Sequence, residues 1–244
     1  MKTQTSLTWF KQVNKETKPL LLSILIPTLE SRKELFNRLY EKLNKQITEH
    51  SFKDDAEIVY FSDNKEHSIG YKRNRLIEQA KGMFVAFVDD DDDVSDDYVS
   101  LICDAINENP DIDCIGIKGI ITFQGKNPRI FVHSLGYKEY FSKAGMYFRP
   151  PYHLNPIRRE IASKYIFEDV NYSEDIDWAM SICRDESLKK EYLIDNAIYF
   201  YNSRRSWNYQ LLLDLSEPLR HVLGLKLANR VRITRWLKSF FGQR

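Results

Sequence analysis

The hydrophobic pattern of the first half alternates short apolar runs with amphipathic segments. Residues 20–27 are almost continuously apolar, as expected of a strand buried on both faces. Residues 31–49 follow with leucines at helical spacing. The same reading predicts further strands at 57–61, 83–88 and 113–123, and helices at 73–80 and 95–109. This alternation predicts an α/β fold in which helices flank a mostly parallel sheet.

Three of these predicted strands end at a proline or an aspartate. Pro27 closes the first strand, Asp63 follows the second, and Asp89 follows the third. Ligands of open parallel sheets bind beyond the carboxyl ends of the strands. We therefore expect these three loops to converge on one crevice.

The second half of the chain has a less regular pattern. Residues 128–150 contain short aromatic segments, and a helix is predicted to start at Asn155-Pro156 and run to Ala162. Another helix is predicted at 174–183 and a late strand at 197–201. The pattern after Trp207 is helical. No repeat or flexible linker interrupts the chain, which suggests one large domain with an appended segment.

Composition narrows the class of protein. The 244 residues include 43% hydrophobic and 29% charged residues, which is typical of a globular protein. The net charge of +1 argues against a protein that coats nucleic acid, and we expect no nucleic-acid partner. The three cysteines have no metal-ligand spacing, and the N-terminal residues lack the apolar core of a signal peptide. We therefore expect a cytoplasmic location.

Five consecutive aspartates, Asp89 to Asp93, follow the third predicted strand. Adjacent carboxylates repel one another and their pKa values rise unless cations lie among them. In an extended loop Asp89 and Asp91 point to the same side, where they can bind Mg²⁺ or Mn²⁺ together with a diphosphate. The simpler alternative is an acidic helix start, which suits Asp96 and Asp97.

The sequence around these aspartates resembles family-2 glycosyltransferases with the GT-A fold, including branches found in bacteria, phages and large viruses. The resemblance lies in three segments in order: a P-T-L-E-S-R turn at 27–32, an R-N pair at 73–74 inside 68–75, and A-K-G-M-F-V-A-F-V-D-D-D-D at 80–92. It covers about residues 20–205. It implies a domain over residues 1–218, with a nucleotide-sugar-binding half at about 20–125 and an acceptor half at about 126–205.

The resemblance implies roles for individual residues. Asp91 and Asp89 would bind the metal, Mn²⁺ or Mg²⁺. The residues implied in nucleotide-sugar binding are Pro27, Thr28, Asp63, Lys72, Arg73, Asp89, Asp90, Arg204 and Arg205. The chain departs from the usual family wording at Glu30 and at Ser62-Asp63-Asn64, which leaves the identity of the nucleotide open.

On the acceptor side, Ser173-Glu-Asp-Ile-Asp-Trp178 resembles the family segment that carries the catalytic base. Inverting transfer needs a carboxylate that deprotonates the acceptor hydroxyl, and the resemblance assigns this role to Asp175. Glu174, Asp177, His153 and Asn155 are predicted to shape the acceptor site. The alternatives are an ordinary helix capped by Ser173, a structural histidine, and a solvated basic turn at Arg204-Arg205.

The resemblance predicts an inverting transfer of a sugar from a nucleoside diphosphate-sugar, with UDP as the default nucleotide, to a glycan or lipid-linked hydroxyl. A sugar nucleotidyltransferase is one alternative, but residues 28–32 contain no glycine for a phosphate loop. A non-catalytic sugar- or metal-binding module is the other, and the presence of both Asp91 and Asp175 argues against it.

The C-terminal segment 219–244 carries seven Lys or Arg residues and no Asp or Glu. Val222, Leu225, Ile233 and Trp236 follow one helical stripe. A basic amphipathic helix of this kind can lie on an anionic membrane surface or pack on an acidic domain. Peripheral contact with the inner face of a membrane is therefore an expectation for this extension.

Overall fold

The computed structural model describes residues 19–49 and 52–203. The ten strands of this part are β1 (Leu22–Leu29), β2 (Ala56–Asp63), β3 (Phe84–Phe87), β4 (Asp93–Val94), β5 (Cys114–Phe123), β6 (Lys126–His133), β7 (Phe141–Lys143), β8 (Met146–Arg149), β9 (Ile157–Arg158) and β10 (Glu191–Ser203). The helices are η1 (Glu30–Arg32), α1 (Lys33–Glu49), α2 (Ile69–Gln79), α3 (Tyr98–Glu108), α4 (Arg159–Ala162) and α5 (Glu174–Arg184). The alternating pattern of the first half is confirmed by this order.

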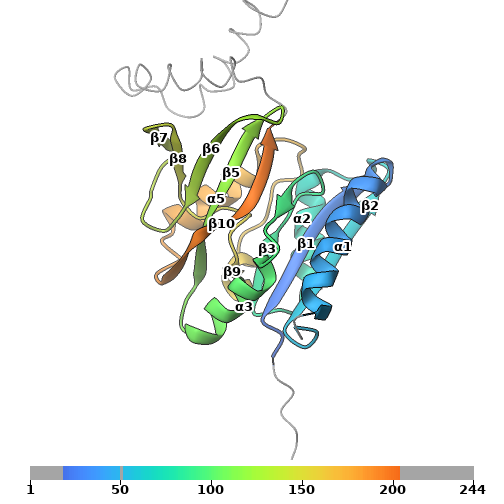
Figure 1. The fold of residues 1–244 in the computed structure, drawn as a ribbon, viewed down its shortest axis with the longest axis horizontal. Coiled ribbons are helices and arrows are strands. Elements are labelled where there is room, and N and C mark those ends of the chain that lie inside the picture. Colours follow the sequence, from blue (N-terminus) through green and yellow to red (C-terminus); the bar gives the residue numbers. More distant parts are fainter. Residues whose placement is uncertain (1–18, 50–51, 204–244) are drawn as a thin grey trace, which may run out of the picture.

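One sheet joins the two halves of the chain (Figure 1). Its strand order is β2-β1-β3-β9-β5-β6-β8-β7, and β10 pairs with β5 and β4. The pairs β1–β2, β1–β3 and β5–β10 are parallel, whereas β9 runs antiparallel to β3 and β5. Helices cover the sheet, with α1 packed near α3 and α2 near α5. The predicted α/β class with a largely parallel central sheet is confirmed.

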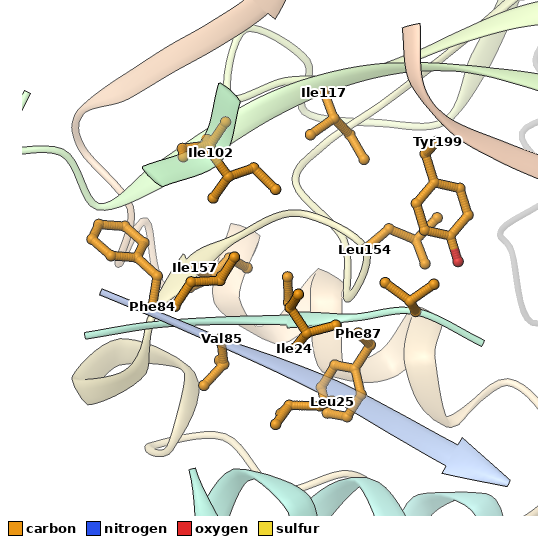
Figure 2. Packing of buried hydrophobic residues seen from close by; sticks show 14 of the residues in the cluster. Ile24, Leu25, Phe84, Val85, Phe87, Ile102, Ile117, Leu154, Ile157 and Tyr199 are labelled. Carbon is orange, nitrogen blue, oxygen red and sulfur yellow. The ribbon is translucent and has the colours of Figure 1, made fainter. Parts of the chain in front are cut away.

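The core lies where these layers meet (Figure 2). Ile24 and Leu25 of β1, Phe84 and Phe87 of β3, and Ile157 of β9 are at most 1% exposed. Burial on both faces of β1 and β3 explains their continuous apolar runs. The rigid centre of the sheet therefore fixes the place where β1 and β3 end.

Two predicted helix starts are wrong. The helix expected at Asn155-Pro156 begins only at Arg159, because Ile157 pairs with Val85 and Cys114 to form β9. Ser95 is not an N-cap: α3 begins at Tyr98, and the backbone N–H of Ser95 donates to the carbonyl of Ile198 instead. In both cases pairing between distant segments overrides the local signal.

Some predictions fall outside the described residues. These are Arg204, Arg205, the helical pattern after Trp207 and the extension 219–244. No helix within the described ranges is long and apolar enough to cross a bilayer.

Candidate active site

The carboxyl ends of β1 and β2 meet at one edge of the sheet, as predicted. Leu29 stands in register with Asp63 across this pair. Lys72 of α2 ties the two ends together, because its ammonium donates to the Thr28 carbonyl at 2.7 Å and also binds the Asp63 carboxylate. Lys72 is only 2% exposed, so it is a buried link rather than a free cation. Pro27, buried beside Thr28 in β1, belongs to the same edge.

The Asp63 side chain is held within its own loop. Its carboxylate accepts hydrogen bonds from the backbone N–H of Lys65 at 3.1 Å and of His67 at 2.9 Å. Burial alone would raise the pKa of Asp63, but the hydrogen bond from Lys72 and the two backbone donors lower it. Asp63 is therefore an ionised carboxylate with several local donors, and its contact with a nucleobase stays a prediction.

The aspartate run forms a tight turn, so the prediction of an extended loop is wrong. The backbone N–H of Asp92 donates to the carbonyl of Asp89 at 3.0 Å and closes this turn. In a turn, side chains two residues apart no longer lie on the same side as they do in a strand. Asp89 contacts Arg73, whereas Asp91 contacts Arg32.

Residues of neighbouring elements contact the aspartates of this turn, and Arg32 contacts two of them. Asp90 is fully buried and accepts a hydrogen bond from the Thr28 hydroxyl at 2.6 Å. Arg32 lies 2.8 Å from Asp90 and 2.6 Å from Asp91. Tyr199 of β10 donates to Asp92 at 2.7 Å. The expected repulsion is thus relieved by the protein's own donors, although burial still raises the pKa values of Asp90 and Asp92.

Arg73 links the aspartate turn to the acceptor half. Its guanidinium lies 3.1 Å from Asp89 and 3.3 Å from Glu174, and it covers the ring of Phe87 at 4.9 Å. Burial alone would raise the pKa of Asp89, but the charges and hydrogen bonds of Arg73 and His153 together bring the pKa below its ordinary value. Arg73 is only 2% exposed, so in this structure its guanidinium is a buried link between the Asp89 and Glu174 carboxylates.

The face of α2 that carries Arg73 also clamps the loop before α5. Asn74 exchanges two hydrogen bonds of 2.9 Å with the backbone of Phe167. A Cβ atom on Gly70 would lie 1.7 Å from the carbonyl oxygen of Glu168, so only glycine allows this approach. The loop therefore reaches α5 from a fixed position, and it does so without a Ser173 cap: Ser173 is left-handed, with φ of 72°, and makes no capping hydrogen bond.

Asp175 lies in the first turn of α5, where two buried side chains face it. His153 places Nδ1 at 3.8 Å from Asp175 Oδ2 and Nε2 at 3.9 Å from Asp89 Oδ2. Burial, followed by the charge of Arg73, lowers the pKa of His153, which favours the neutral ring. Burial, followed by the charge of Asp175, raises the pKa of Tyr152 well above its ordinary value, so Tyr152 keeps its proton. Asp175 itself stays 24% exposed at its side chain.

The remaining predicted acceptor residues separate into two kinds. Asn155 is buried and uses its amide on the backbone, accepting from Tyr152 N–H and donating to the carbonyls of Ile115 and His133. It therefore holds the turn that carries His153. Glu174 is buried against Arg73, and only Asp177 is exposed to solvent.

A cleft of about 480 Å³ opens beside the aspartate turn. Asp91, Asp93 and Arg38 of α1 are among the residues that line it. Thr122 and Asn202, near the carboxyl ends of β5 and β10, complete it. The cleft thus lies at the edge where a parallel sheet binds its ligands.

The donor set suits a metal that takes most of its ligands from a substrate. Within the ranges that the structure describes, no group of three or more His, Cys, Asp or Glu side chains is arranged around a metal position. Mg²⁺ is usually held by one or two carboxylates together with substrate phosphates. Asp91 and Asp89 retain 32% and 31% side-chain exposure, so their oxygens are accessible for this purpose.

The sequence also matches a model of a known protein family. The model described as Glycosyl transferase family 2 matches residues 38–166, more than half of the chain. The chain belongs to family 2 of the glycosyltransferases. No curated protein matches it.

The fold of this glycosyltransferase is similar to that of TarS from S. aureus. A structure of TarS residues 1–349 with UDP has a TM-score of 0.53 and 19% identity, covering 75% of this chain and 61% of the other. A structure of the same TarS segment with UDP-GlcNAc gives 0.52 and 18%, covering 77% and 60%. The chain therefore spans about three fifths of the TarS segment.

Sequence reasoning gave no site role to Arg32, Tyr152 or Tyr199. Arg32 stands in the P-T-L-E-S-R turn, so the family wording contained a signal for it. Tyr152 precedes His153, but its approach to Asp175 depends on the folded turn. Tyr199 reaches Asp92 across 107 residues of sequence, which no local pattern reveals.

Proposed function

We propose that this glycosyltransferase transfers a sugar with inversion from a UDP-sugar to the hydroxyl of a glycan or lipid-linked acceptor. The observation that carries the proposal is the position of His153 between Asp89 and Asp175. It brings a carboxylate of the donor side and a partly exposed carboxylate of the acceptor side into one site. The UDP and UDP-GlcNAc complexes of TarS support a UDP-sugar as the donor.

In this proposal Asp175 is the general base. Its carboxylate takes the proton of the acceptor hydroxyl while the hydroxyl oxygen forms a bond to the anomeric carbon. The bond from that carbon to the diphosphate breaks, and its electron pair leaves with the diphosphate. Attack and departure occur on opposite faces, so the configuration inverts. Tyr152 and neutral His153 are the buried side chains that face the Asp175 carboxylate.

Asp91 and Asp89 would each offer a carboxylate to the Mg²⁺ or Mn²⁺ ion, and such an ion neutralises the charge of a diphosphate. Thr28 and Lys72 fix the strand ends where the nucleotide is expected. Arg204 and Arg205 follow Asn202 of the cleft closely in sequence, and we assign them to the leaving diphosphate because guanidinium groups suit phosphate oxygens.

The decisive test combines donor binding with turnover. We expect Mn²⁺-dependent UDP binding by calorimetry and slow release of UDP from UDP-sugars by the full chain. Asp91→Ala should abolish the metal dependence of UDP binding while the circular dichroism spectrum is kept. Asp104→Ala, on the exposed side of α3, is the matched control. Equal Mn²⁺-dependent UDP affinity in wild type and Asp91→Ala would overturn the metal assignment, and a product with retained anomeric configuration would overturn the mechanism.

A further inference from the structure

Arg32 is a cation placed inside the aspartate turn. It ends the short helix η1 directly after β1, and its guanidinium spans two neighbouring carboxylates. One nitrogen lies 2.8 Å from Asp90 Oδ1 and the other lies 2.6 Å from Asp91 Oδ2. Arg32 therefore touches the same carboxylate that the proposed function assigns to the metal.

The two contacts of Arg32 differ in their surroundings. Asp90 has no exposed surface and is fixed by the Thr28 hydroxyl at 2.6 Å. Asp91 is 32% exposed at its side chain and lines the cleft. The contact with Asp90 is therefore an anchor, whereas Asp91 presents part of its carboxylate to the cleft, where another cation can reach it.

A guanidinium and a divalent ion are alternative partners for the same carboxylate oxygen. A bound Mg²⁺ lies at about 2.0–2.1 Å from its oxygen ligands, so an Arg32 nitrogen next to Asp91 would stand close to a second positive charge. Their repulsion opposes metal binding for as long as Arg32 stays in place. A diphosphate removes this obstacle, because its oxygens offer the guanidinium fork a new anionic partner.

We propose that Arg32 is a positioning residue that binds Asp91 in the free enzyme and releases it to the metal when the donor diphosphate binds. The proposal rests on the proposed function, since it takes the diphosphate and the metal from there. Its consequence is that metal and nucleotide bind cooperatively. Coupling of this kind typically changes affinity by about 5- to 150-fold.

The test measures Mn²⁺ binding to the full chain by electron paramagnetic resonance of the free ion, with and without UDP. Protein-free Mn²⁺–UDP titrations correct for binding in solution. The variants are Arg32→Gln and Arg32→Met, two uncharged replacements whose folding is checked by circular dichroism. Arg75→Gln, an exposed arginine on α2, is the control.

For the wild type and Arg75→Gln we expect weak Mn²⁺ binding alone and at least about fivefold tighter binding with UDP. Either Arg32 variant should bind Mn²⁺ alone at least about fivefold more tightly than the wild type, and UDP should add less. If the folded variants bind Mn²⁺ alone no more tightly than the wild type, Arg32 does not compete for Asp91 and the inference fails while the proposed function stands. If the wild type binds no Mn²⁺ even with UDP, the metal assignment and this inference fail together.

Discussion

The two acidic segments of the site, 89–93 and 174–177, are built in opposite ways. In the first, each of Asp89 to Asp93 faces an arginine, lysine or tyrosine side chain from another part of the chain, and Arg32 contacts two of them. In the second, Glu174 has such a partner in Arg73, whereas Asp175 faces a tyrosine and a histidine. Contacts with arginine or lysine hold a carboxylate in one place, whereas Asp175 has a buried tyrosine and a buried histidine as neighbours and keeps a partly exposed side chain. This contrast supports our proposal that Asp175 is the base.

Among the variants considered, Asp175→Asn is expected to have the largest effect, and it tests whether the two acidic segments differ in function. An amide fills the same space but cannot take the acceptor proton, so we expect transfer to fall by about 10²- to 10⁴-fold. UDP binding should be kept, because donor contacts lie on the other segment. Transfer is measured with an accepted hydroxyl substrate and binding by calorimetry, with Asp104→Asn as the control. Near wild-type turnover would mean that another group is the base.

Arg73→Met tests the residue that joins the two segments. It leaves the carboxylates of Asp89 and Glu174 without their shared cation in a buried position. We expect the free energy of unfolding to drop by about 3–5 kcal/mol, measured by urea denaturation. Arg75→Met, on the same helix but 46% exposed at its side chain, should change it by less than about 1 kcal/mol. Similar losses for both variants would show that Arg73 is not a buried link.

The pH dependence of stability sharpens the comparison on the acceptor side. His133 is 2% exposed, and burial, then the charge of Arg149, lowers its pKa well below the ordinary value of 6.5. Below that value the unfolded chain binds a proton that the folded chain does not, so stability is complete above it and falls as the pH drops. We expect a loss of up to about 1.4 kcal/mol per pH unit from this group.

Urea denaturation of His133→Leu between pH 7 and pH 5 checks this expectation. The variant should show a flatter pH dependence than the wild type. An unchanged slope in His133→Leu would assign the loss of stability to other groups.

Lys42→Ala is expected to have the smallest effect. Lys42 pairs with Asp93 at 3.1 Å and with Asp96 at 3.2 Å, at the open end of the aspartate run. Exposed ion pairs of this type contribute about 0.2–1 kcal/mol, and salt weakens them. Thermal denaturation at low and high salt measures this contribution, with Lys45→Ala as the control. A loss above about 2 kcal/mol would show that the outer end is compensated as tightly as Asp89.

Local signals predicted the strands of the donor half well, because burial on both faces leaves a continuous apolar run such as that of β1. They failed at β9, where Ile157 pairs with strands far away in sequence. The resemblance to the family drew attention to Arg73 and to Glu174, but it could not reveal their contact, which spans 101 residues. Asn155 likewise turned out to hold backbone, a function that depends on the folded turn.

The clamp between α2 and the 167–171 loop has a consequence for protein engineering. Gly70 and Asn74 belong to the donor half, yet the backbone they hold belongs to the acceptor half. A chimera that keeps residues 20–125 and takes the remaining half from another protein would keep Gly70 and Asn74 but lose the 167–171 backbone that contacts them. The graft would need a backbone that fits against Gly70 and an acid that meets Arg73. For redesign of the proposed acceptor site, we therefore favour substitutions at exposed positions such as Asp177 over the exchange of whole halves.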